Sequence, residues 1–260
     1  MVAEGEAPTW SLPRRGWQIV RELAVIAIAI TLYFGVRGLI TTRIGTAYHN
    51  AVRVIDLEKS ADIFVEPRLQ RAVISHGWLA EALGSVYIYG HWPVLIATLL
   101  WLLIRHRDTY PKFRNAMLLS GAVGLVIFAV FPVAPPRFLT AYGFVDTVTD
   151  RIPAYRVLQP PGFTNQYAAV PSLHFGWNLL MGIAVASVGT HWILRVFGWV
   201  MPILMFAAIV LTANHYILDG VLGGVLALLG LLAAFRLSRR RPAVRGHPSG
   251  QRSSRVESPW

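Results

Sequence analysis

Residues 192–235 of this chain, WILRVFGWVMPILMFAAIVLTANHYILDGVLGGVLALLGLLAAF, decide its fold. The stretch contains only two charged residues, Arg195 and Asp219. A helix needs about 20 mostly apolar residues to cross a bilayer. The stretch therefore predicts two membrane-spanning helices, Trp192–Ala213 and Tyr216–Phe235, with His215 in the turn between them.

Four more apolar stretches extend this pattern over most of the 260 residues. They predict spans at Trp17–Leu39, Ala82–Ile104, Asn115–Phe131 and Ser172–Gly189. The first span is shortened by three charged residues, Arg21, Glu22 and Arg37. Its apolar run is not followed by a small-x-small cleavage site before Arg37, so we interpret it as an uncleaved anchor. Thr46–Lys59 and Asp62–Ser75 have the pattern of short amphipathic helices that lie on the outer membrane surface or cap the bundle.

The composition agrees with a membrane protein. Hydrophobic residues make up 55% of the chain and charged residues 14%, and the mean hydropathy is +0.50. Soluble domains contain about 25% charged residues, so these values argue against an ordinary water-soluble enzyme and exclude a disordered chain. The predicted fold class is all-α, a polytopic membrane bundle of six transmembrane helices with short interfacial helices between the first two spans.

The basic residues predict how the bundle is oriented. If the N-terminus is inside, the inner segments hold 15 Lys or Arg in 63 residues and the outer segments 9 in 85. Basic residues concentrate in cytoplasmic loops, so both termini are predicted to be cytoplasmic in a plasma-membrane protein. We expect one membrane domain, 17–236, between a cytoplasmic segment, 1–16, and a disordered basic tail, 237–260.

The net charge of +11 does not point to nucleic acid. Seven of the 24 Lys and Arg residues follow Phe235, and most of the others flank apolar stretches. The lipid bilayer is therefore the expected partner of this charge. The chain has no cysteine, which excludes disulfides, thiolate metal sites and cysteine nucleophiles.

Ionisable side chains inside membrane spans are costly, and they are functional candidates by default. Asp219 lies four residues after His215, and residues at that spacing share one face of a helix. The carboxylate can accept a hydrogen bond from one imidazole nitrogen, which leaves the lone pair of the other nitrogen available for attack. The alternative is a buried ion pair that only joins the fifth span to the sixth.

A second group, Ala-Val-Pro-Ser-Leu-His (169–174), opens the predicted fourth span. Ser172 is a favourable N-cap residue, and the N–H groups of a first helical turn carry the positive end of the helix dipole. A phosphate fits such a place, and His174 lies in the same turn. Taken singly, Ser172 is more simply read as a cap and His174 as an interfacial histidine.

A third group, Phe-Pro-Val-Ala-Pro-Pro-Arg (131–137), follows the predicted third span, and its prolines present Arg137 from a stiff segment. A guanidinium offers a planar fork for phosphate oxygens, although a lone arginine at a membrane boundary more often contacts headgroups. One topology, inferred without these residues, puts all five candidates at the outer face: Arg137, Ser172, His174, His215 and Asp219. This coincidence predicts a phosphoryl-transfer site, with His215 as nucleophile and His174 as proton donor.

These motifs resemble a known family. Pro-Ser-Leu-His (171–174) and His-x-x-x-Asp (215–219) are similar to motifs of the type 2 phosphatidic acid phosphatase superfamily, which contains metal-independent lipid-phosphate phosphatases. Its inositol-phosphorylceramide-synthase-like branch resembles the chain at Ala-Pro-Pro-Arg (134–137), Asn-Gln-Tyr-Ala-Ala-Val-Pro-Ser-Leu-His (165–174) and Asn-His-Tyr-Ile-Leu-Asp (214–219). Segments 58–66 and 89–93 are also similar to that branch. The resemblance covers roughly residues 55–225.

The resemblance implies a role for each candidate and no cofactor. His215 is the implied phosphohistidine nucleophile, Asp219 its orienter, His174 the acid, and Ser172 and Arg137 the phosphate contacts. The chain departs from the phosphatase pattern at three positions, where Ile209, Val130 and Leu173 replace an arginine, a lysine and a glycine. Arg151 or Arg156 is a candidate for the missing positive charge, and the departures affect the identity of the substrate more than the chemistry.

Other notable residues receive structural interpretations. His91 is expected to pack against Trp92 or to form a structural hydrogen bond. Gly220 and Gly224 predict close helix packing that positions Asp219. A zinc site is not expected, because the two site histidines lack a third good ligand apart from Asp219.

The expected activity is hydrolysis of a phosphate ester or pyrophosphate of a membrane lipid at the outer face. A phosphotransferase that moves an inositol-phosphate-like headgroup onto another lipid or a polyol is the alternative, and the branch resemblance favours it. Two interpretations from other classes are a lipid transporter or binding protein without turnover and a membrane scaffold with a decayed site. Internal repeats typical of transporters are not evident in the sequence.

Overall fold

The computed structural model describes residues 43–147 and 165–239, together with scattered helical positions between 17 and 35. Within these ranges the chain is helical and contains no strand, which confirms the all-α membrane bundle. The helices are α2 (Ile44–Ser60), α3 (Glu66–Ile74), α4 (Gly77–Tyr89), α5 (Trp92–Arg105), α6 (Tyr110–Val130), α9 (Leu173–Val188), α10 (Trp192–Leu211) and α11 (Ile217–Arg239). Two short 3-10 helices, η1 (Pro136–Phe138) and η2 (Thr140–Tyr142), follow α6.

Among the described residues, three helices are long and apolar enough to cross a membrane: α6, α10 and α11. The pair α4 and α5 makes a fourth crossing if it is counted as one bent span, and α9 is apolar but shorter. Ten of the 23 residues of the predicted span Trp17–Leu39 lie outside the described residues, as do segment 1–16 and residues 240–260. The last helix continues to Arg239 and so includes the first three residues of the predicted tail.

The predicted second span, Ala82–Ile104, is not one continuous helix. It is broken after Tyr89, and α4 and α5 meet at an angle of 41°. Pro93 lies in the first turn of α5 and has no N–H to donate to the preceding turn, so the α4 helix cannot continue through it. The break places His91 at the N-terminus of α5 rather than within a span.

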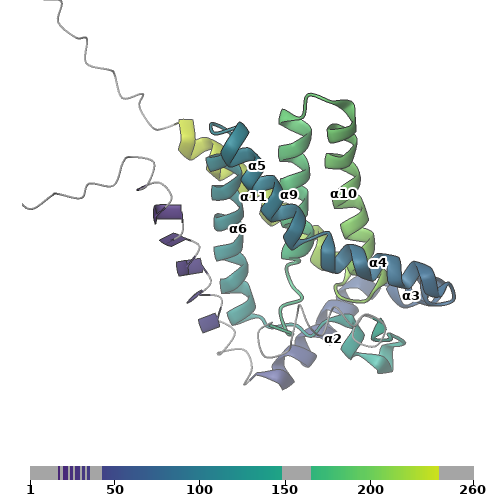
Figure 1. Ribbon diagram of the computed structural model, residues 1–260. Helices are drawn as coiled ribbons and strands as arrows, with labels where there is room; N and C mark the ends of the chain where they lie inside the picture. Colours follow the sequence, from purple (N-terminus) through teal and green to yellow (C-terminus); the bar gives the residue numbers. More distant parts are fainter. Residues whose placement is uncertain are drawn as a thin grey trace, which may run out of the picture.

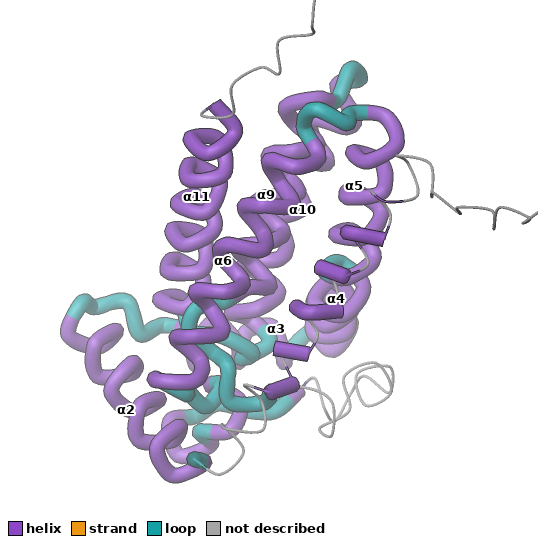
Figure 2. The backbone as a smooth tube through the Cα atoms, turned by 90° about the vertical axis from the view of Figure 1, so that its left-hand side faces the viewer, coloured by secondary structure: helices purple, strands orange, loops and turns teal. Residues whose placement is uncertain are grey.

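The two short helices between the first spans cap one end of the bundle. Figures 1 and 2 show α2 across the lower end, while α6, α9, α10 and α11 extend away from it. Buried residues of α2, among them Ala47, Ala51 and Ile55, pack in one apolar cluster with Val133 and Tyr216. This cluster joins α2 to the segment after α6 and to the start of α11, so it stabilises the end where the candidate residues lie.

Glycines let α9 and α11 approach each other closely beside the candidate site. A Cβ on Gly223 would stand 2.1 Å from the backbone oxygen of Ser172, and one on Gly176 would stand 2.5 Å from the backbone oxygen of Gly223. Neither position can accept a side chain without moving a helix. The start of α9 is therefore held against α11 one turn beyond Asp219. Gly220 and Gly224 pack as predicted, close to Phe206 and Phe175.

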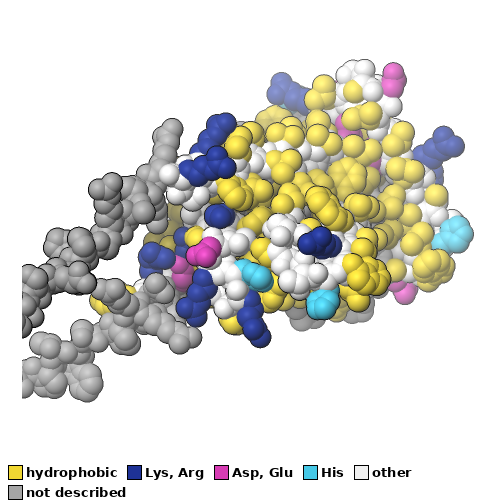
Figure 3. Space-filling view, turned by 90° about the horizontal axis from the view of Figure 1, so that it is seen from above, with side chains coloured by type: hydrophobic (Ala, Val, Ile, Leu, Met, Phe, Trp, Pro, Cys, Tyr) yellow, Lys and Arg dark blue, Asp and Glu magenta, His cyan; other side chains and the backbone are white. Residues whose placement is uncertain are grey.

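The opposite end of the bundle is rich in basic residues. Figure 3 views this end and shows Lys and Arg side chains around a largely apolar face. Exposed arginines here include Arg105, Arg195, Arg236 and Arg239. Exposed basic residues also occur at the site end, among them Arg53 and Lys59 of α2.

Candidate active site

The predicted nucleophile, His215, lies in the turn between α10 and α11. Ala213 ends α10 with a left-handed φ of 55°, which is uncommon for a residue other than glycine. The backbone N–H groups of Asn214 and His215 then both donate to the carbonyl oxygen of Ile209 at 3.0 Å. The turn fixes the backbone of His215 directly before the first turn of α11.

Two acceptors face Nδ1 of His215. The carbonyl oxygen of Ala169 is 2.8 Å away, and Oδ2 of Asp219 is 3.4 Å away. A carbonyl oxygen can only accept, so Nδ1 carries the proton and Nε2 has the lone pair. The structure thus brings Asp219 to His215 as the sequence predicts, but the shorter hydrogen bond goes to the backbone of Ala169, immediately before Val170 and Pro171.

His174 lies beside His215, with 5.7 Å between the ring centroids. Its ring stacks on Tyr87 and contacts His91 at centroid distances of 4.6 and 4.2 Å. Nε2 of His174 is buried and has no hydrogen-bond partner among the described residues. An imidazole nitrogen that is buried without a partner in a cluster of rings is suited to bind a polar group of a ligand.

His91 is part of the support for His174. Its Nδ1 lies 3.0 Å from Nδ2 of Asn178, which also donates to the backbone oxygen of His174 at 3.0 Å. The ring packs edge-on against Trp92, as expected from the sequence. The additional contact with His174 was not expected, and it follows from the break between α4 and α5.

Ser172 begins α9 as its N-cap. The hydroxyl accepts from the N–H of Phe175 at 3.4 Å, and the residue is fully buried. The backbone N–H of Ser172 donates to the carbonyl oxygen of Asp219 at 2.9 Å, which joins the start of α9 to α11. The structure therefore gives Ser172 the capping role, and a contact between Ser172 and phosphate stays a prediction.

Arg137 is buried next to the turn that carries His215. Its backbone N–H donates to Ala213 at 2.9 Å, its guanidinium donates to Oδ1 of Asn214, and Nε lies 3.6 Å from Oδ2 of Asp146. The guanidinium also lies over the ring of Phe138. These contacts hold a positive charge beside both histidines.

The positions that depart from the phosphatase pattern contribute no charge. Ile209 is buried in an apolar cluster with Met205 and Ala208, and Val130 is an exposed apolar residue. Arg151 and Arg156, the predicted substitutes, lie outside the described residues. Among the described residues, Arg137 is therefore the cation that the structure places at this site.

Several site residues received no role from the sequence. Asn178 follows His174 by one helical turn, and Asn214 directly precedes His215. This spacing was the only feature of the sequence that pointed to them. Glu58 and Glu66 lie in a segment that carries the family resemblance, yet they are 150 residues or more from α11 in sequence. Nothing local in the sequence reveals that they meet it.

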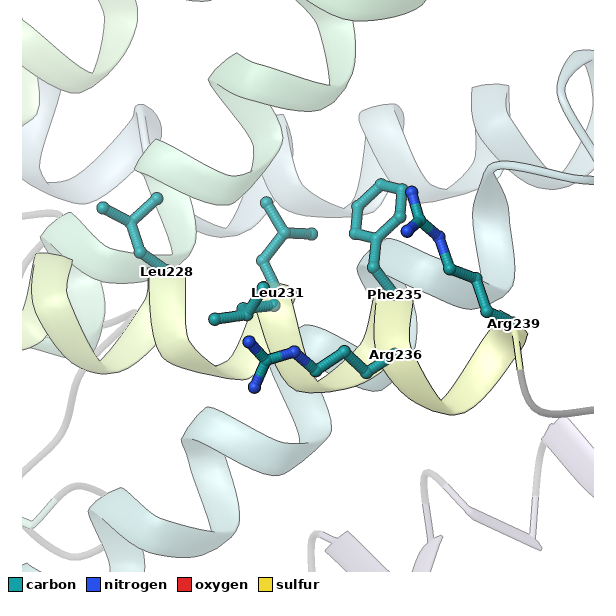
Figure 4. Close-up of a pocket in the computed structure, with 6 residues that line it drawn as sticks. Leu228, Leu231, Phe235, Arg236 and Arg239 are labelled. Atoms are coloured by element: carbon teal, nitrogen blue, oxygen red, sulfur yellow. The ribbon is translucent and has the colours of Figure 1, made fainter.

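Two grooves lie outside this cluster. One of about 510 Å³ runs along the basic end of α11, lined by Leu228, Leu231, Leu232, Phe235, Arg236 and Arg239 (Figure 4). It begins nine residues beyond Asp219, roughly 13 Å along the helix at 1.5 Å per residue, so it is not the site of chemistry. A second groove, of about 310 Å³, lies between α2 residues Tyr48, His49 and Val52 and residues 138–142. It adjoins Arg137.

The surroundings of His215 favour its neutral form. Burial lowers the pKa of His215 to about 4; the hydrogen bond to Ala169 opposes this change, and the charge of Arg137 adds to it. A neutral imidazole with Nδ1–H fixed is a nitrogen nucleophile. With Arg137 and His174 beside it, the arrangement can attack a phosphorus atom, hold its oxygens and protonate a leaving group.

Three comparisons relate the chain to known proteins. A curated relative, phosphoinositol dihydroceramide synthase of Bacteroides thetaiotaomicron, is 29% identical over 175 residues, which cover 60% of this chain and 56% of the relative. The chain thus matches little more than half the length of that relative. The crystal structure of LpxE from Aquifex aeolicus aligns with a TM-score of 0.49 and 16% identity, over 65% of this chain and 93% of that one. The family model of the PAP2 superfamily matches residues 52–233, which include every candidate residue, and the chain belongs to that superfamily.

Proposed function

We propose that this chain transfers the phosphoryl group of a membrane lipid through a covalent phosphohistidine on His215. In the first step, the Nε2 lone pair bonds to phosphorus, the bond from phosphorus to the lipid oxygen breaks, and that oxygen takes a proton from the imidazolium form of His174, which becomes neutral. In the second step, an acceptor hydroxyl bonds to phosphorus, the N–P bond breaks, and the hydroxyl proton passes to His174. Arg137 and the first-turn N–H groups of α9 stabilise the charge on the phosphate oxygens.

One observation carries this proposal, namely the bond from His215 Nδ1 to the carbonyl oxygen of Ala169 at 2.8 Å. This bond fixes the tautomer of His215 that has its lone pair on Nε2. The ring centroids of His215 and His174 are 5.7 Å apart. A second imidazole at that separation can serve a phosphate bound between the two rings.

The acceptor in the second step is either the hydroxyl of another lipid or water. Both histidines are largely buried, and a site that excludes bulk water protects a reactive intermediate from hydrolysis. The printed name of the relative, a phosphoinositol dihydroceramide synthase, also favours a lipid hydroxyl. Water, the acceptor expected from the sequence, is the second candidate.

The groove of about 310 Å³ beside Arg137 supports a lipid substrate. Aromatic and aliphatic side chains line most of it, including Tyr48, Val52 and Phe138. A phosphate held by Arg137 would have an apolar surface next to it for the adjoining part of a lipid. A lipid transporter would bind its lipid in the same kind of groove, so a measurement of turnover distinguishes an enzyme from a transporter.

The site end is proposed to face away from the cytoplasm, because the segments assigned to the inside hold 15 Lys or Arg in 63 residues and those assigned to the outside hold 9 in 85. The chain has no cysteine, so single cysteines can report orientation. Thr140→Cys, at the site end, should react with a membrane-impermeant maleimide in intact cells, and Asp108→Cys should react only after lysis. The reverse labelling pattern would show the opposite orientation.

The central experiment uses purified protein in detergent, without added metal, and short-chain phosphatidic acid with radiolabelled phosphate. The wild type should release phosphate and form a labelled protein that survives alkali and is lost in acid, as a phosphoramidate is. His215→Ala should abolish both signals, while His76→Ala, an exposed histidine at the same end, should keep them. Label that persists in His215→Ala would refute the nucleophile. Adding a long-chain alcohol or a ceramide should then produce a labelled phosphomonoester of that alcohol if a lipid hydroxyl is the acceptor.

A further inference from the structure

The start of α11 is bound by three carboxyl groups. Three consecutive backbone N–H groups each donate to a different side chain: Tyr216 to Asp219 at 2.9 Å, Ile217 to Glu66 at 3.1 Å and Leu218 to Glu58 at 2.9 Å. Asp219 belongs to α11 itself, whereas Glu58 comes from the end of α2 and Glu66 from the start of α3. One capping side chain is usually enough to start a helix.

All three carboxyl groups are completely buried. Burying a carboxyl is costly unless it is hydrogen-bonded or neutralised, and a helix N-terminus repays only part of that cost. A fold that places Glu58 and Glu66 here, from segments 150 residues or more away, therefore needs a reason beyond helix initiation. The neighbouring residue gives one, because His215 directly precedes the N–H groups that these carboxyls hold.

We propose, on the basis of the function proposed above, that Glu58 and Glu66 are positioning residues for phosphoryl transfer. They clamp the first turn of α11 and share one proton, so that His215 and Asp219 are held in place by a pair that carries a single negative charge. They touch neither phosphate nor the reacting nitrogen, and they act through the backbone of residues 217 and 218.

The contacts of the two glutamates support a shared proton. Each uses Oε1 to accept from α11, and each Oε2 lacks an N–H or O–H donor among the described residues. Burial, together with the neighbouring Glu66 carboxyl, raises the pKa of Glu58 to about 9. At neutral pH Glu58 is therefore the protonated partner, and its O–H donates to Glu66.

This arrangement predicts an alkaline limit to catalysis. The charged or titratable groups around Glu58 are Glu66 from α3, Asp219 from α11 and Tyr216 in the turn before α11. When Glu58 loses its proton, two buried carboxylates lie close together beside Asp219, and their repulsion loosens the clamp. Stability changes with the same sign: the contribution of Glu58 is fully present below its ordinary pKa of 4.5 and is lost as the pH rises through about 9.

Two substitutions of Glu58 test the proposal. Glu58→Gln keeps an oxygen for the N–H of Leu218 and gains an NH₂ donor toward Glu66, but it cannot titrate. It should retain kcat within about threefold at neutral pH and lose the decline near pH 9. Glu58→Leu removes the clamp and should lower kcat by about 10- to 100-fold with little change in KM, since small misplacements of reacting groups have effects of that size.

The control is Asn50→Ala, which removes another buried polar side chain of α2, one that donates to the backbone of Pro132 at 2.9 Å and not to α11. Thermal unfolding and kinetics are measured together for all four proteins. Three results would each overturn the proposal. The first is an unchanged kcat in Glu58→Leu, and the second is a loss of kcat in Glu58→Leu no larger than that of an equally destabilised Asn50→Ala. The third is an alkaline decline that persists in Glu58→Gln. Turnover that does not depend on His215 would instead overturn the proposed function, and that result comes from the His215→Ala experiment.

Discussion

The polar residues of the candidate site differ in burial and in bonding from those at the other end of the bundle. In the site, His215, Arg137 and the carboxyls of Glu58, Glu66 and Asp219 are buried, and each is hydrogen-bonded to the backbone or to another side chain. At the other end, Arg195, Arg236 and Arg239 are exposed, and the groove beside Arg236 and Arg239 is lined mostly by apolar side chains. Buried polar groups cost several kcal/mol unless they find partners, whereas exposed substitutions usually change stability by no more than about 0.5 kcal/mol. Matched substitutions at the two ends should therefore have very different effects.

The largest contrast is expected between two histidines. His174→Gln should lower kcat by about 10²- to 10⁴-fold, the range for loss of a general acid. The loss should shrink for a substrate whose leaving group needs no proton, such as an aryl phosphate, because the acid then contributes little. His106→Gln at the other end, which removes a ring packed on Trp101, should change kcat by no more than about twofold. An equal loss for alkyl and aryl substrates would assign His174 a role other than proton donor.

A smaller contrast is expected between two arginines. Arg137→Lys keeps the charge but loses the fork that contacts Asn214 and faces the phosphate site, and hydrogen bonds to charged groups contribute about 1.5–3 kcal/mol. We expect kcat/KM to fall about 10- to 100-fold. Arg195→Lys loses a bond to the carbonyl of Gly189 and should stay within about twofold. Steady-state kinetics of both variants in one detergent measures this difference. Similar losses of kcat/KM in Arg137→Lys and Arg195→Lys would mean that burial of the arginine does not determine the size of the loss.

The acidic side of the pH profile should report the burial of His215. Its pKa is about 4 instead of the ordinary 6.5, so the imidazole stays neutral and nucleophilic well below neutral pH. We expect kcat/KM to fall about tenfold per pH unit only below about pH 4. The contribution to stability has the same direction: it is present above 6.5 and is lost as the pH falls through about 4. A phosphodiester substrate, whose charge is constant over this range, isolates the enzyme's titration. A midpoint near 6.5 would show that His215 is hydrated in the resting enzyme.

The sequence predicts most of the fold because hydrophobic periodicity and charge spacing are local signals. The predicted fifth span, Trp192–Ala213, differs from α10 by two residues, and Ser172 caps α9 at the predicted residue. The break at His91 was missed because Ala82–Ile104 contains no residue of fixed charge, and its hydropathy was given more weight than the helix-breaking residues Gly90 and Pro93. Hydropathy does not distinguish a straight span from a bent one.

The site was predictable only where its residues are neighbours in sequence or begin helices. His215 and Asp219 are four residues apart, and His174 and Arg137 follow from a helix start and a helix end. The bond from His215 to Ala169 was not predictable, because a backbone carbonyl leaves no mark in the residue types. Glu58 and Glu66 were not predictable either, because only the folded chain brings α2 and α3 to the start of α11.

The smallest effect is expected at the arginines that line the groove in Figure 4. Arg236→Gln with Arg239→Gln removes two exposed charges from the last turn of α11, some 20 residues beyond the residues that hold His215. In detergent, kcat and KM should stay within about twofold, and the free energy of unfolding should change by no more than about 0.5 kcal/mol per substitution. The positive charges can still matter in a membrane, where they lie near anionic headgroups, so the same variant should bind vesicles containing anionic lipid less tightly. A tenfold loss of kcat in detergent would contradict the contrast directly, because it would require α11 to transmit a change from its exposed end to the clamped turn at its start.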